Sequence, residues 1–389
     1  MTTTARHVPP DAADVVIIGG GIMGLSAAYH LAAAGVERVV LVERGALGEG
    51  STCKAAGGVR ALFSDEINIK LGLRSLETFE RFGTEFGQEI DLHQVGYLFL
   101  LDGEEDLDTF ARNAELQNAL GVPSRVIDVA EAKRLSPLID TEGLVGALYS
   151  PRDGHCTPES VVLGYAGAAR RAGARLVTGC AATGIDTEGG EITAVHTEHG
   201  TIRTATVICT VGAWAKEVGA WAGVTLPVEP LRRQIVITEP VPGLARDTPF
   251  TIDFSTSFYF HNEGKGLLMG MPDPVDSWGF DQTRDPEWLA DLAEVLERRV
   301  PALGDVGIAS GWAGLYEMTP DHNALIGRSA QVPGFLYATG FSGHGFLMGP
   351  AVGEVLRDLY IGATPFVDVS ALSADRFTNA DIRRELNIV

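Results

Sequence analysis

The 389-residue sequence predicts an α/β fold made of two lobes, and three observations support that prediction. A short run of branched aliphatic residues, 14–18, passes through consecutive glycines into the alanine-rich segment 22–34. A second unit of strand, glycines and helix occupies residues 334–362. The chain is also longer than one hydrophobic core usually serves, which favours two domains or two interleaved lobes.

The first unit has the layout of a dinucleotide-binding site. Its strand, 14–18, is short, β-branched and apolar, as expected for a parallel strand buried on both faces. Three glycines follow at G-x-G-x-x-G spacing, Gly35 fits the end of the helix, and a second apolar strand ends at Glu43. Together these features indicate a Rossmann-like strand–turn–helix–strand unit. They do not distinguish NAD from FAD, although Glu43 argues against a 2′-phosphate.

Each position of this unit has a predicted role. Gly19 permits the tight turn, Gly21 lets a pyrophosphate approach the N-terminus of the helix, and Gly24 lets the helix pack closely on the strand. Glu43 is expected to accept hydrogen bonds from ribose hydroxyls. The neighbouring residues predicted to contact the cofactor at this end are Ile22, Met23 and Arg44.

The second unit predicts a second helix N-terminus that faces a ligand. A strand over 335–339 leads through glycines into a helix over 346–360, whose apolar residues form one stripe. The alternative is a glycine-rich loop that only packs tightly. Two such units suit a long cofactor held at both ends, and FAD fits, with its pyrophosphate at the first unit and its flavin at the second. The contacts predicted here are Gly340, Gly343, Gly345, Phe346 and Leu347.

Composition excludes several classes of function. The sequence has 30 Lys and Arg against 51 Asp and Glu, a net charge of −21, which makes nucleic acid a poor partner. No run of about 18 apolar residues predicts a membrane span. The four cysteines form no C-x-x-C pair and have no histidines at zinc-ligand spacing, so we expect reduced thiols and no metal. Residues 1–12 lack the layout of a signal peptide, which favours the cytoplasm.

Several segments carry a resemblance to a known family, and their order holds along nearly the whole chain. They are GGGIMGLSAAYHLAAAG with VERG, GSTCKAAGGVRALFSDE, TVGAWA, WAGLYEMTPDHNALIG and ATGFSGHGFLMGPAVGEVLRDL. The sequence resembles the FAD-dependent family of D-amino-acid oxidase, glycine oxidase and sarcosine oxidase. The group that it resembles most is that of the sarcosine oxidase and proline dehydrogenase β-subunits, on the stretches FSDEINIKLGLRS, VGYLFLL and GHGFLMGPAVGE.

The resemblance implies a Rossmann-like FAD-binding lobe interleaved with a mixed-sheet substrate-binding lobe. The FAD-binding lobe would comprise residues 13–90, 145–225 and 305–370. The substrate lobe would comprise residues 91–144 and 226–304. The remaining segments would be a flexible tail over 1–12 and a C-terminal tail over 371–389.

The local patterns are compatible with this division. Over 176–211 the pattern predicts a small antiparallel meander, with the Gly-Gly pair at 189–190 as a hairpin turn, that feeds a buried strand, TVICTVG. Further strands are predicted over 231–238 and 266–271. Amphipathic helices are predicted over 65–83 and 285–300.

Three residues are candidates for catalysis. By the resemblance, Arg60 grips the substrate carboxylate, for which a guanidinium offers a planar fork; the alternative is a surface or FAD-contacting arginine. His344 is either a base or a residue that packs and bonds to the backbone. Tyr259 either lines the substrate pocket or is a core aromatic residue.

The resemblance also extends the cofactor site. Ser51 and Thr52 would meet the pyrophosphate, cap a helix, or do both. Gly212 and Gly314 are further predicted cofactor contacts. Gly314 stands where monomeric sarcosine oxidase has the cysteine that tethers its flavin, so we expect FAD to be bound non-covalently.

Two other departures from the family pattern concern the reaction. Leu268 stands in the place of the oxygen-activating lysine, and Leu347 stands in the place of a second cation for the carboxylate. Arg60 is therefore expected to act alone. The electron acceptor, which is O₂ or another carrier, stays open.

The predicted function is FAD-dependent oxidation of the C–N bond of a secondary amino acid of the sarcosine, N-methyl amino acid or proline type. A hydride would pass to flavin N5 and leave an imine that water hydrolyses. The alternatives are a D-amino-acid or glycine deaminating oxidase or dehydrogenase, a flavin-bearing subunit active only in a larger complex, and an NAD-binding protein. A homo-oligomer and a partner subunit both stay open.

Overall fold

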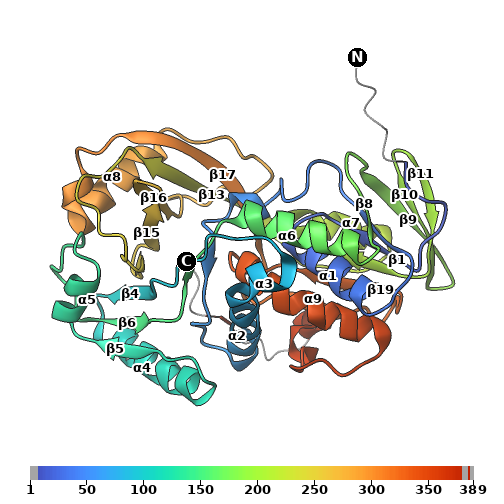
Figure 1. The fold of residues 1–389 in the computed structure, drawn as a ribbon, viewed down its shortest axis with the longest axis horizontal. Coiled ribbons are helices and arrows are strands. Elements are labelled where there is room, and N and C mark those ends of the chain that lie inside the picture. Colours follow the sequence, from blue (N-terminus) through green and yellow to red (C-terminus); the bar gives the residue numbers. More distant parts are fainter. Residues whose placement is uncertain (1–7, 379–383, 386–389) are drawn as a thin grey trace.

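Two extended sheets organise the chain in the computed structural model, which describes residues 8–378 and 384–385 (Figure 1). One sheet has six strands and lies under a layer of helices, and the other is a mixed sheet of eight strands. Segments from both halves of the sequence enter each sheet. The predicted α/β fold is confirmed.

The six-stranded sheet is built from short strands buried on both faces. All four residues of β1 (Val15–Ile18) and of β2 (Val39–Val42) are buried, and the two strands run parallel. The order across the sheet is β18 (Leu325–Arg328), β19 (Phe335–Thr339), β12 (Val207–Cys209), β1, β2 and β8 (Arg175–Val177). Every neighbouring pair is parallel except β18 and β19.

Alternate residues of β1 face two different layers. Val15 and Ile17 pack in the core formed with the helices, whereas Val16 and Ile18 pack in the core formed with a three-stranded meander. Because a strand presents successive side chains to opposite faces, an uninterrupted apolar run is what a sheet covered on both sides requires.

The meander forms where the sequence predicts it, with one difference. Its strands are β9 (Ala182–Glu188), β10 (Glu191–Thr197) and β11 (Gly200–Arg203). Gly189 and Gly190 both have positive φ, 62° and 87°, as the predicted hairpin turn needs. Residues 175–177 are not part of the meander, because Leu176 and Val177 are apolar and pair with β2 as the edge of the six-stranded sheet.

The helical layer covers the opposite face of the six-stranded sheet (Figure 1). Its members are α1 (Ile22–Ala33), α2 (Glu66–Glu80), α3 (Phe82–Phe86), α6 (Pro158–Arg171) and α9 (Gly345–Ile361). The helix predicted over 65–83 is thus divided: Asp65 accepts a hydrogen bond from the Ile67 N–H at its start, and the non-helical backbone of Arg81 separates α2 from α3.

Helices α1 and α9 cross at unusually close range. A Cβ added to Gly353 would lie 2.7 Å from the carbonyl carbon of Ser26, and one added to Gly349 would overlap Ile22. Arg74 of α2 then makes a two-pronged contact with Glu354 of α9, with nitrogen–oxygen distances of 2.9 to 3.2 Å. These contacts fix where both helices begin.

The eight-stranded sheet forms the second lobe. Its order is β17 (Ile308–Met318), β13 (Glu229–Thr238), β16 (Gly266–Met271), β15 (Phe258–Glu263), β14 (Phe250–Asp253), β4 (Tyr97–Leu101), β6 (Gly146–Ser150) and β5 (Arg125–Ile127). β14 and β4 are parallel and the other pairs are antiparallel. The helices of this lobe are α4 (Glu104–Ala119), α5 (Val129–Leu135) and α8 (Trp288–Arg299).

The strands and helix predicted in this part of the sequence are present. β13, β16 and α8 match the predicted segments 231–238, 266–271 and 285–300. On α8, Leu292 and Leu296 are buried. β6 and β17 come from segments assigned to the FAD-binding lobe on sequence grounds, yet they pair in the eight-stranded sheet, so the lobe boundaries stay a prediction.

Several short elements complete the fold. They are β3 (Gly58–Val59), β7 (Gly154–His155), α7 (Ala215–Trp221) and the 3₁₀ turns η1 (Thr52–Lys54), η2 (Gly212–Trp214), η3 (Pro301–Leu303), η4 (Ser370–Leu372) and η5 (Ala374–Thr378). β3 and β7 form a two-stranded sheet, which holds the loop carrying Arg60 against the start of α6.

Parts of the predicted tails lie outside the described residues, namely 1–7, 379–383 and 386–389. At one end, Ala12 pairs with Arg203 of β11. At the other, Arg376 binds Asp321 with distances of 2.7 and 2.8 Å, and the buried Glu385 accepts a hydrogen bond from Asn68.

Because α1 and α9 cross so closely, we expect replacement of a glycine at the crossing by alanine to destabilise the protein. Gly353→Ala should lower the free energy of unfolding by about 1–3 kcal/mol, because its methyl group has no room, although alanine favours a helix more than glycine does. Urea unfolding followed by tryptophan fluorescence measures this.

The matched control is Gly167→Ala in α6. Its methyl group would meet only the flexible end of the Arg171 side chain, at 3.2 Å. This variant should be unchanged or up to about 1 kcal/mol more stable. If both variants are stabilised, the helices do not cross as closely as described.

Candidate active site

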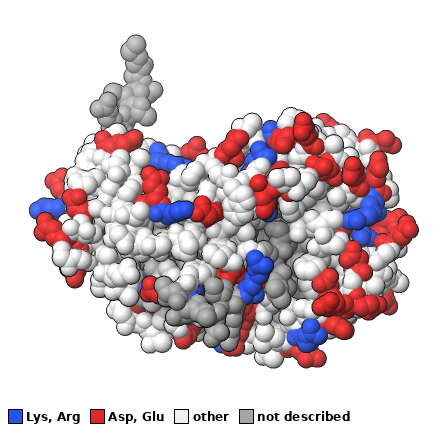
Figure 2. Space-filling view, turned by 180° about the vertical axis from the view of Figure 1, so that it is seen from behind, with Lys and Arg blue, Asp and Glu red and all other residues white. Residues whose placement is uncertain are grey.

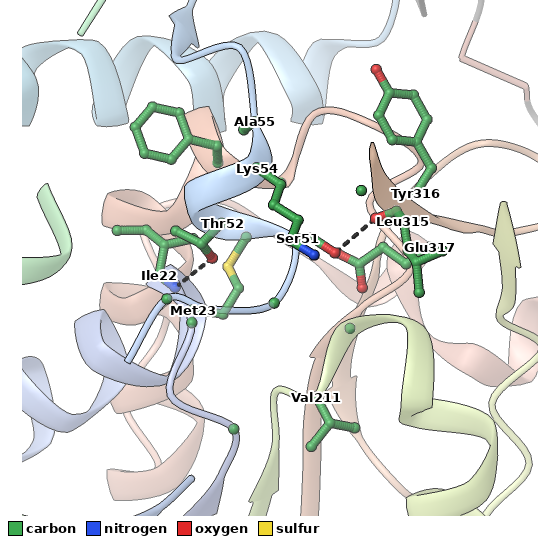
Figure 3. A pocket seen from close by; sticks show the side chains of 18 of the residues that line it. Ile22, Met23, Ser51, Thr52, Lys54, Ala55, Val211, Leu315, Tyr316 and Glu317 are labelled. Atoms are coloured by element: carbon green, nitrogen blue, oxygen red, sulfur yellow. Dashed lines mark hydrogen bonds between the residues drawn. The ribbon is translucent and has the colours of Figure 1, made fainter. Parts of the chain in front are cut away.

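A cavity of about 760 Å³ lies where the two lobes meet. Its walls come from the glycine loop after β1, the segment after β2, the 48–60 loop, the start of α9, and one face of the eight-stranded sheet. Figure 3 shows part of it, with the N-terminus of α1 on one side and β17 on the other. The volume falls in the usual range for a bound cofactor or small ligand.

Nearly all residues predicted for the site line this one cavity. They are Gly19, Gly21, Ile22, Met23, Glu43, Arg44, Ser51, Thr52, Arg60, Gly212, Tyr259, Gly314, Gly343, His344, Gly345, Phe346 and Leu347. The two that do not line it are Gly24 and Gly340. Residues far apart in the sequence are thus brought together, while the role of each stays a prediction.

Gly24 and Gly340 lie behind the cavity wall. A Cβ on Gly24 would overlap the carbonyl oxygen of Gly19 and lie 2.8 Å from Thr210 Oγ1, so α1 could not pack as closely on the sheet. A Cβ on Gly340 would lie 2.5 Å from Thr319 Cγ2. The backbone N–H of Gly340 donates a hydrogen bond to Glu317 Oε2 at 2.9 Å. Both glycines shape the loops that reach the cavity.

The N-terminus of α1 opens into the cavity. Gly21 precedes the helix and offers no side-chain cap, and Thr52 Oγ1 accepts a hydrogen bond from the Ile22 N–H at 3.1 Å (Figure 3). The carboxylate of Glu43 accepts hydrogen bonds from the N–H groups of Gly20 at 2.7 Å and Gly45 at 2.8 Å. An anion-binding helix end therefore lies beside a carboxylate held in a fixed position.

The 48–60 loop joins this end of the cavity to the eight-stranded sheet. Ser51 Oγ donates to the Leu315 carbonyl of β17 at 2.7 Å, so its side chain bonds to the sheet and does not cap η1 (Figure 3). Lys54 binds Gln282 through its ammonium group, and its carbonyl accepts a hydrogen bond from Trp312 Nε1 at 2.9 Å. A Cβ added to Gly314 would lie only 3.0 Å from the Cβ of Lys54, so the glycine leaves room for the aliphatic part of the lysine side chain.

The turn before α9 packs directly on β17. Gly343 has a φ of +101°, and a Cβ there would lie 2.5 Å from Cε2 of Tyr316. Next to it on β17, Glu317 Oε2 accepts hydrogen bonds from Thr339 Oγ1 and the Gly340 N–H, both at 2.9 Å. Tyr316 and Glu317 point away from each other (Figure 3).

Sequence reasoning missed Glu317 as a site residue. It lines the cavity, and burial raises the pKa of its carboxyl group to about 7. The available signal was a carboxylate at the end of an otherwise mostly apolar strand, directly before Met-Thr-Pro. This pattern could not predict that Glu317 lines the cavity, because the loop that donates hydrogen bonds to it, 339–341, comes from a different part of the chain.

Arg60 lies at the other end of the cavity and is only 5% exposed. Its guanidinium donates to the Leu62 carbonyl and lies over the ring of Phe63, 4.3 Å from the centroid. Burial lowers the pKa of Arg60, and the nearby Tyr97, Glu385 and Asp153 act in the opposite direction. An arginine stays charged even so, which places a desolvated cation in an aromatic wall.

Buried hydroxyl groups surround this end. Tyr97, Tyr259 and Tyr316 all line the cavity. Burial raises the pKa of each of these phenols, so all three are neutral hydrogen-bonding groups at physiological pH. The ring of Tyr259 stacks on Phe250 with the centroids 5.5 Å apart, so this residue combines the two predicted roles of pocket lining and aromatic packing.

His344 lies at the start of α9 and is buried. Its ring makes edge contacts with Phe63 and Phe341. Among the described residues, neither ring nitrogen has a hydrogen-bond partner. Burial lowers the pKa of His344 to about 3, so the imidazole is neutral near pH 7. Both nitrogens are therefore available to a bound molecule.

A third guanidinium, in addition to those of Arg44 and Arg60, also reaches the cavity. Arg233 of β13 lines it, 5.4 Å from the ring centroid of Tyr316, and sequence reasoning did not identify it. Within residues 8–378 and 384–385, no group of His, Cys, Asp and Glu is arranged to hold a metal ion. In the same ranges, no helix is both long enough and apolar enough to cross a bilayer.

Comparison with known proteins gives matches over almost the whole chain. Residues 14–359 match the DAO family, described as FAD dependent oxidoreductase. Mouse (Mus musculus) sarcosine dehydrogenase is 32% identical over 387 residues, which is 95% of this chain and 42% of the mouse protein. The 4-methylaminobutanoate oxidase (formaldehyde-forming) of Paenarthrobacter nicotinovorans is 29% identical over 390 residues, which is 97% of this chain and 47% of the other protein.

Solved structures agree with these matches. L-proline dehydrogenase from P. horikoshii superposes with a TM-score of 0.89 at 36% identity, covering 96% of this chain and 100% of the other. Glycine oxidase from Geobacillus kaustophilus superposes with a TM-score of 0.84 at 25% identity, covering 94% and 99% of the two chains. The chain thus spans less than half of the two curated relatives named above, but the full length of these solved relatives. The fold, the motifs and these matches together show that the chain belongs to the DAO family of FAD-dependent oxidoreductases.

Proposed function

We propose that this protein oxidises the C–N bond of a secondary amino acid, of the sarcosine, N-methyl amino acid or proline type, with non-covalently bound FAD. The observation that carries the proposal is that Arg60, a buried cation, shares one cavity with the glycine-lined starts of α1 and α9. The names of two relatives, sarcosine dehydrogenase and L-proline dehydrogenase, support the same substrate class.

The residues that line the cavity fit FAD. A Cβ on Gly21 would lie 2.9 Å from Thr52 Oγ1, so the glycine keeps open the space above the first N–H groups of α1, where a pyrophosphate is favoured. Glu43 keeps lone pairs for ribose hydroxyls beyond its two backbone bonds. At the other end, the ring nitrogens of His344 have no partner among the described residues.

FAD, when bound, supplies an acceptor for the hydride that leaves the carbon next to the amine. Arg60 would bind the substrate carboxylate and so fix the orientation of that carbon. The aromatic wall of Phe250, Tyr97 and Tyr259 would exclude water and favour the uncharged amine, because burial disfavours an isolated ammonium. The imine product then reacts with water.

Two features support non-covalent attachment. Gly314 offers no thiol at the position where monomeric sarcosine oxidase tethers its flavin, and none of the residues that line the cavity is a cysteine. The electron acceptor, a partner subunit and the cytoplasmic compartment stay predictions.

Removing the Arg60 guanidinium should weaken substrate binding. In Arg60→Met, KM for the best N-methyl or cyclic amino acid should rise roughly a hundredfold, because a charge-assisted two-pronged contact is lost. Anaerobic flavin bleaching at increasing substrate concentration measures this.

The control for Arg60→Met is Arg60→Lys, which keeps the charge without the planar fork. The KM of Arg60→Lys should lie between those of Arg60→Met and the wild type. FAD content should be the same in all three proteins. An unchanged KM in Arg60→Met would remove Arg60 from the substrate site.

Acid precipitation should separate the flavin from the protein. After denaturation with trichloroacetic acid, the yellow colour should stay in the supernatant, because no thiol of the cavity wall can hold it. Absorbance of the pellet and supernatant decides the point. Flavin retained by the washed pellet would contradict non-covalent binding.

The buried carboxyl group of Glu317 should make the free energy of unfolding depend on pH. Burial raises its pKa to about 7 from 4.5, so the folded state holds a proton that the unfolded state releases between these values. Its contribution to stability is therefore complete below about pH 4.5 and is lost as the pH rises through 7, by about 3 kcal/mol. Glu317→Gln cannot ionise and should escape this loss.

Unfolding of the FAD-saturated wild type and of Glu317→Gln should be compared at pH 5 and pH 8. The histidines that titrate in this interval are common to both proteins and cancel in the difference. The variant should gain stability relative to the wild type at pH 8. A difference that is the same at both pH values would show that Glu317 is already ionised in the folded protein.

A further inference from the structure

Strand β13 carries two consecutive arginines that have different tasks. Because alternate residues of a strand face opposite sides, Arg232 and Arg233 point away from each other. Arg232 is held by the 273–285 segment: it reaches Asp273 Oδ2 at 3.3 Å, Ser277 Oγ at 3.0 Å and the Thr283 carbonyl at 3.0 Å. Arg233 lines the cavity instead.

The guanidinium of Arg233 is only partly satisfied. Its Nη1 donates to the Arg232 carbonyl at 3.0 Å and lies 3.4 Å from Asp276 Oδ1. Asp276 is 48% exposed, so this ion pair is long and weak. The Nε of Arg233 is buried and has no partner among the described residues. An arginine that can donate five hydrogen bonds therefore has capacity left for an anion in the cavity.

Arg60 and Arg233 lie on different walls. Arg60 contacts the Leu62 carbonyl and the ring of Phe63, whereas Arg233 contacts Asp276 and the ring of Tyr316. Both guanidinium groups affect the pKa of Tyr316. Burial raises this pKa, whereas the positive charges of Arg233 and, to a smaller extent, Arg60 lower it. Both arginines therefore lie near Tyr316, but no contact between Arg60 and Arg233 is among those described.

One part of the cavity wall carries a cation but no acidic residue, whereas Glu317 of β17 lines the cavity elsewhere and Glu385 and Asp153 lie near Arg60. The cavity-lining residues of β4, β13, β14 and β15 are Tyr97, Arg233, Ile235, Phe250, Ile252 and Tyr259, and none of them is acidic. Arg60 also lines the cavity, so two guanidinium groups reach a largely apolar, phenol-lined space, whereas acidic residues dominate the surface shown in Figure 2. A buried guanidinium that is only partly hydrogen-bonded, as that of Arg233 is, is costly unless an anion meets it.

We propose that Arg233 binds a second carboxylate of the substrate, so that the enzyme acts on secondary amino acids that carry two carboxylates. Arg60 would take the carboxylate next to the reacting carbon, and Arg233 would take one at the end of the N-substituent or of the side chain. This inference rests on the proposed function, because it assigns the substrate class of that same site. Arg233 is therefore a specificity-determining residue.

The test measures binding, without turnover. Thiodiacetate and its longer homologues carry sulfur in place of the amine nitrogen, so they cannot become imines, and each has a matched alkylthioacetate that lacks the second carboxylate. Isothermal titration of the FAD-bound protein should show that the best dicarboxylate binds about tenfold or more tightly than its match. In Arg233→Met this advantage should fall below about threefold, while the affinity for the alkylthioacetates changes little.

Two further variants make the result specific. Arg233→Lys keeps the charge and should retain part of the advantage for dicarboxylates. Arg112→Met removes an exposed cation of α4 that is not part of the cavity lining, and it should change neither affinity. FAD content and the thermal midpoint, measured for every variant, identify a protein that has failed to fold.

The inference is overturned if no dicarboxylate binds more tightly than its match, or if Arg233→Met weakens both members of each pair equally. The latter result would mean that both arginines hold one carboxylate. The proposed function is judged separately, by whether any secondary amino acid bleaches the flavin anaerobically. A protein that oxidises sarcosine or proline but shows no preference for dicarboxylates keeps its proposed function and loses only this inference.

Discussion

The close crossing of α1 and α9 is the constraint on which the site depends. Gly349 and Gly353 of α9 lie against Ile22 and Ser26 of α1, and side chains at either glycine would force the helices apart. Each helix begins directly after a glycine-lined loop, one following β1 and the other following β19. Fixing the crossing therefore aims both N-termini at one cavity, which is the arrangement a long dinucleotide needs.

β17 connects this cofactor end to the substrate end. It is a strand of the eight-stranded sheet, yet Tyr316 packs on the turn before α9 and Glu317 accepts hydrogen bonds from the loop that leads there. Since neighbouring residues of a strand face opposite ways, one strand serves the phenol-lined compartment and the glycine loop at once. A shift of β17 by one residue would exchange the two side chains and disrupt both ends.

The charges of the molecule are divided between surface and cavity. Acidic side chains outnumber basic ones over the face shown in Figure 2, and they are dense over the lobe of the eight-stranded sheet. Inside, the same sheet contributes Arg233 to the cavity that Arg60 also lines, among tyrosines and aliphatic residues. The overall charge therefore gives no indication of the substrate, because what recognises a ligand is the local, desolvated charge of the cavity.

The local units could be predicted from the amino-acid sequence alone. Short apolar strands, glycine spacing and helix composition predicted β1, α1, β2, β19 and α9 nearly to the residue, because each of these patterns reflects contacts within a few residues of the chain. That Arg233 and Glu317 share a cavity with Arg60 follows from the folded structure and not from any local pattern. Which face a strand residue presents depends on strands that pair with it from distant parts of the chain, and β13 gains its orientation from β16 and β17. For the same reason residues 175–177 could be predicted as a strand but not assigned to the correct sheet, since it is the pairing with β2 that places them.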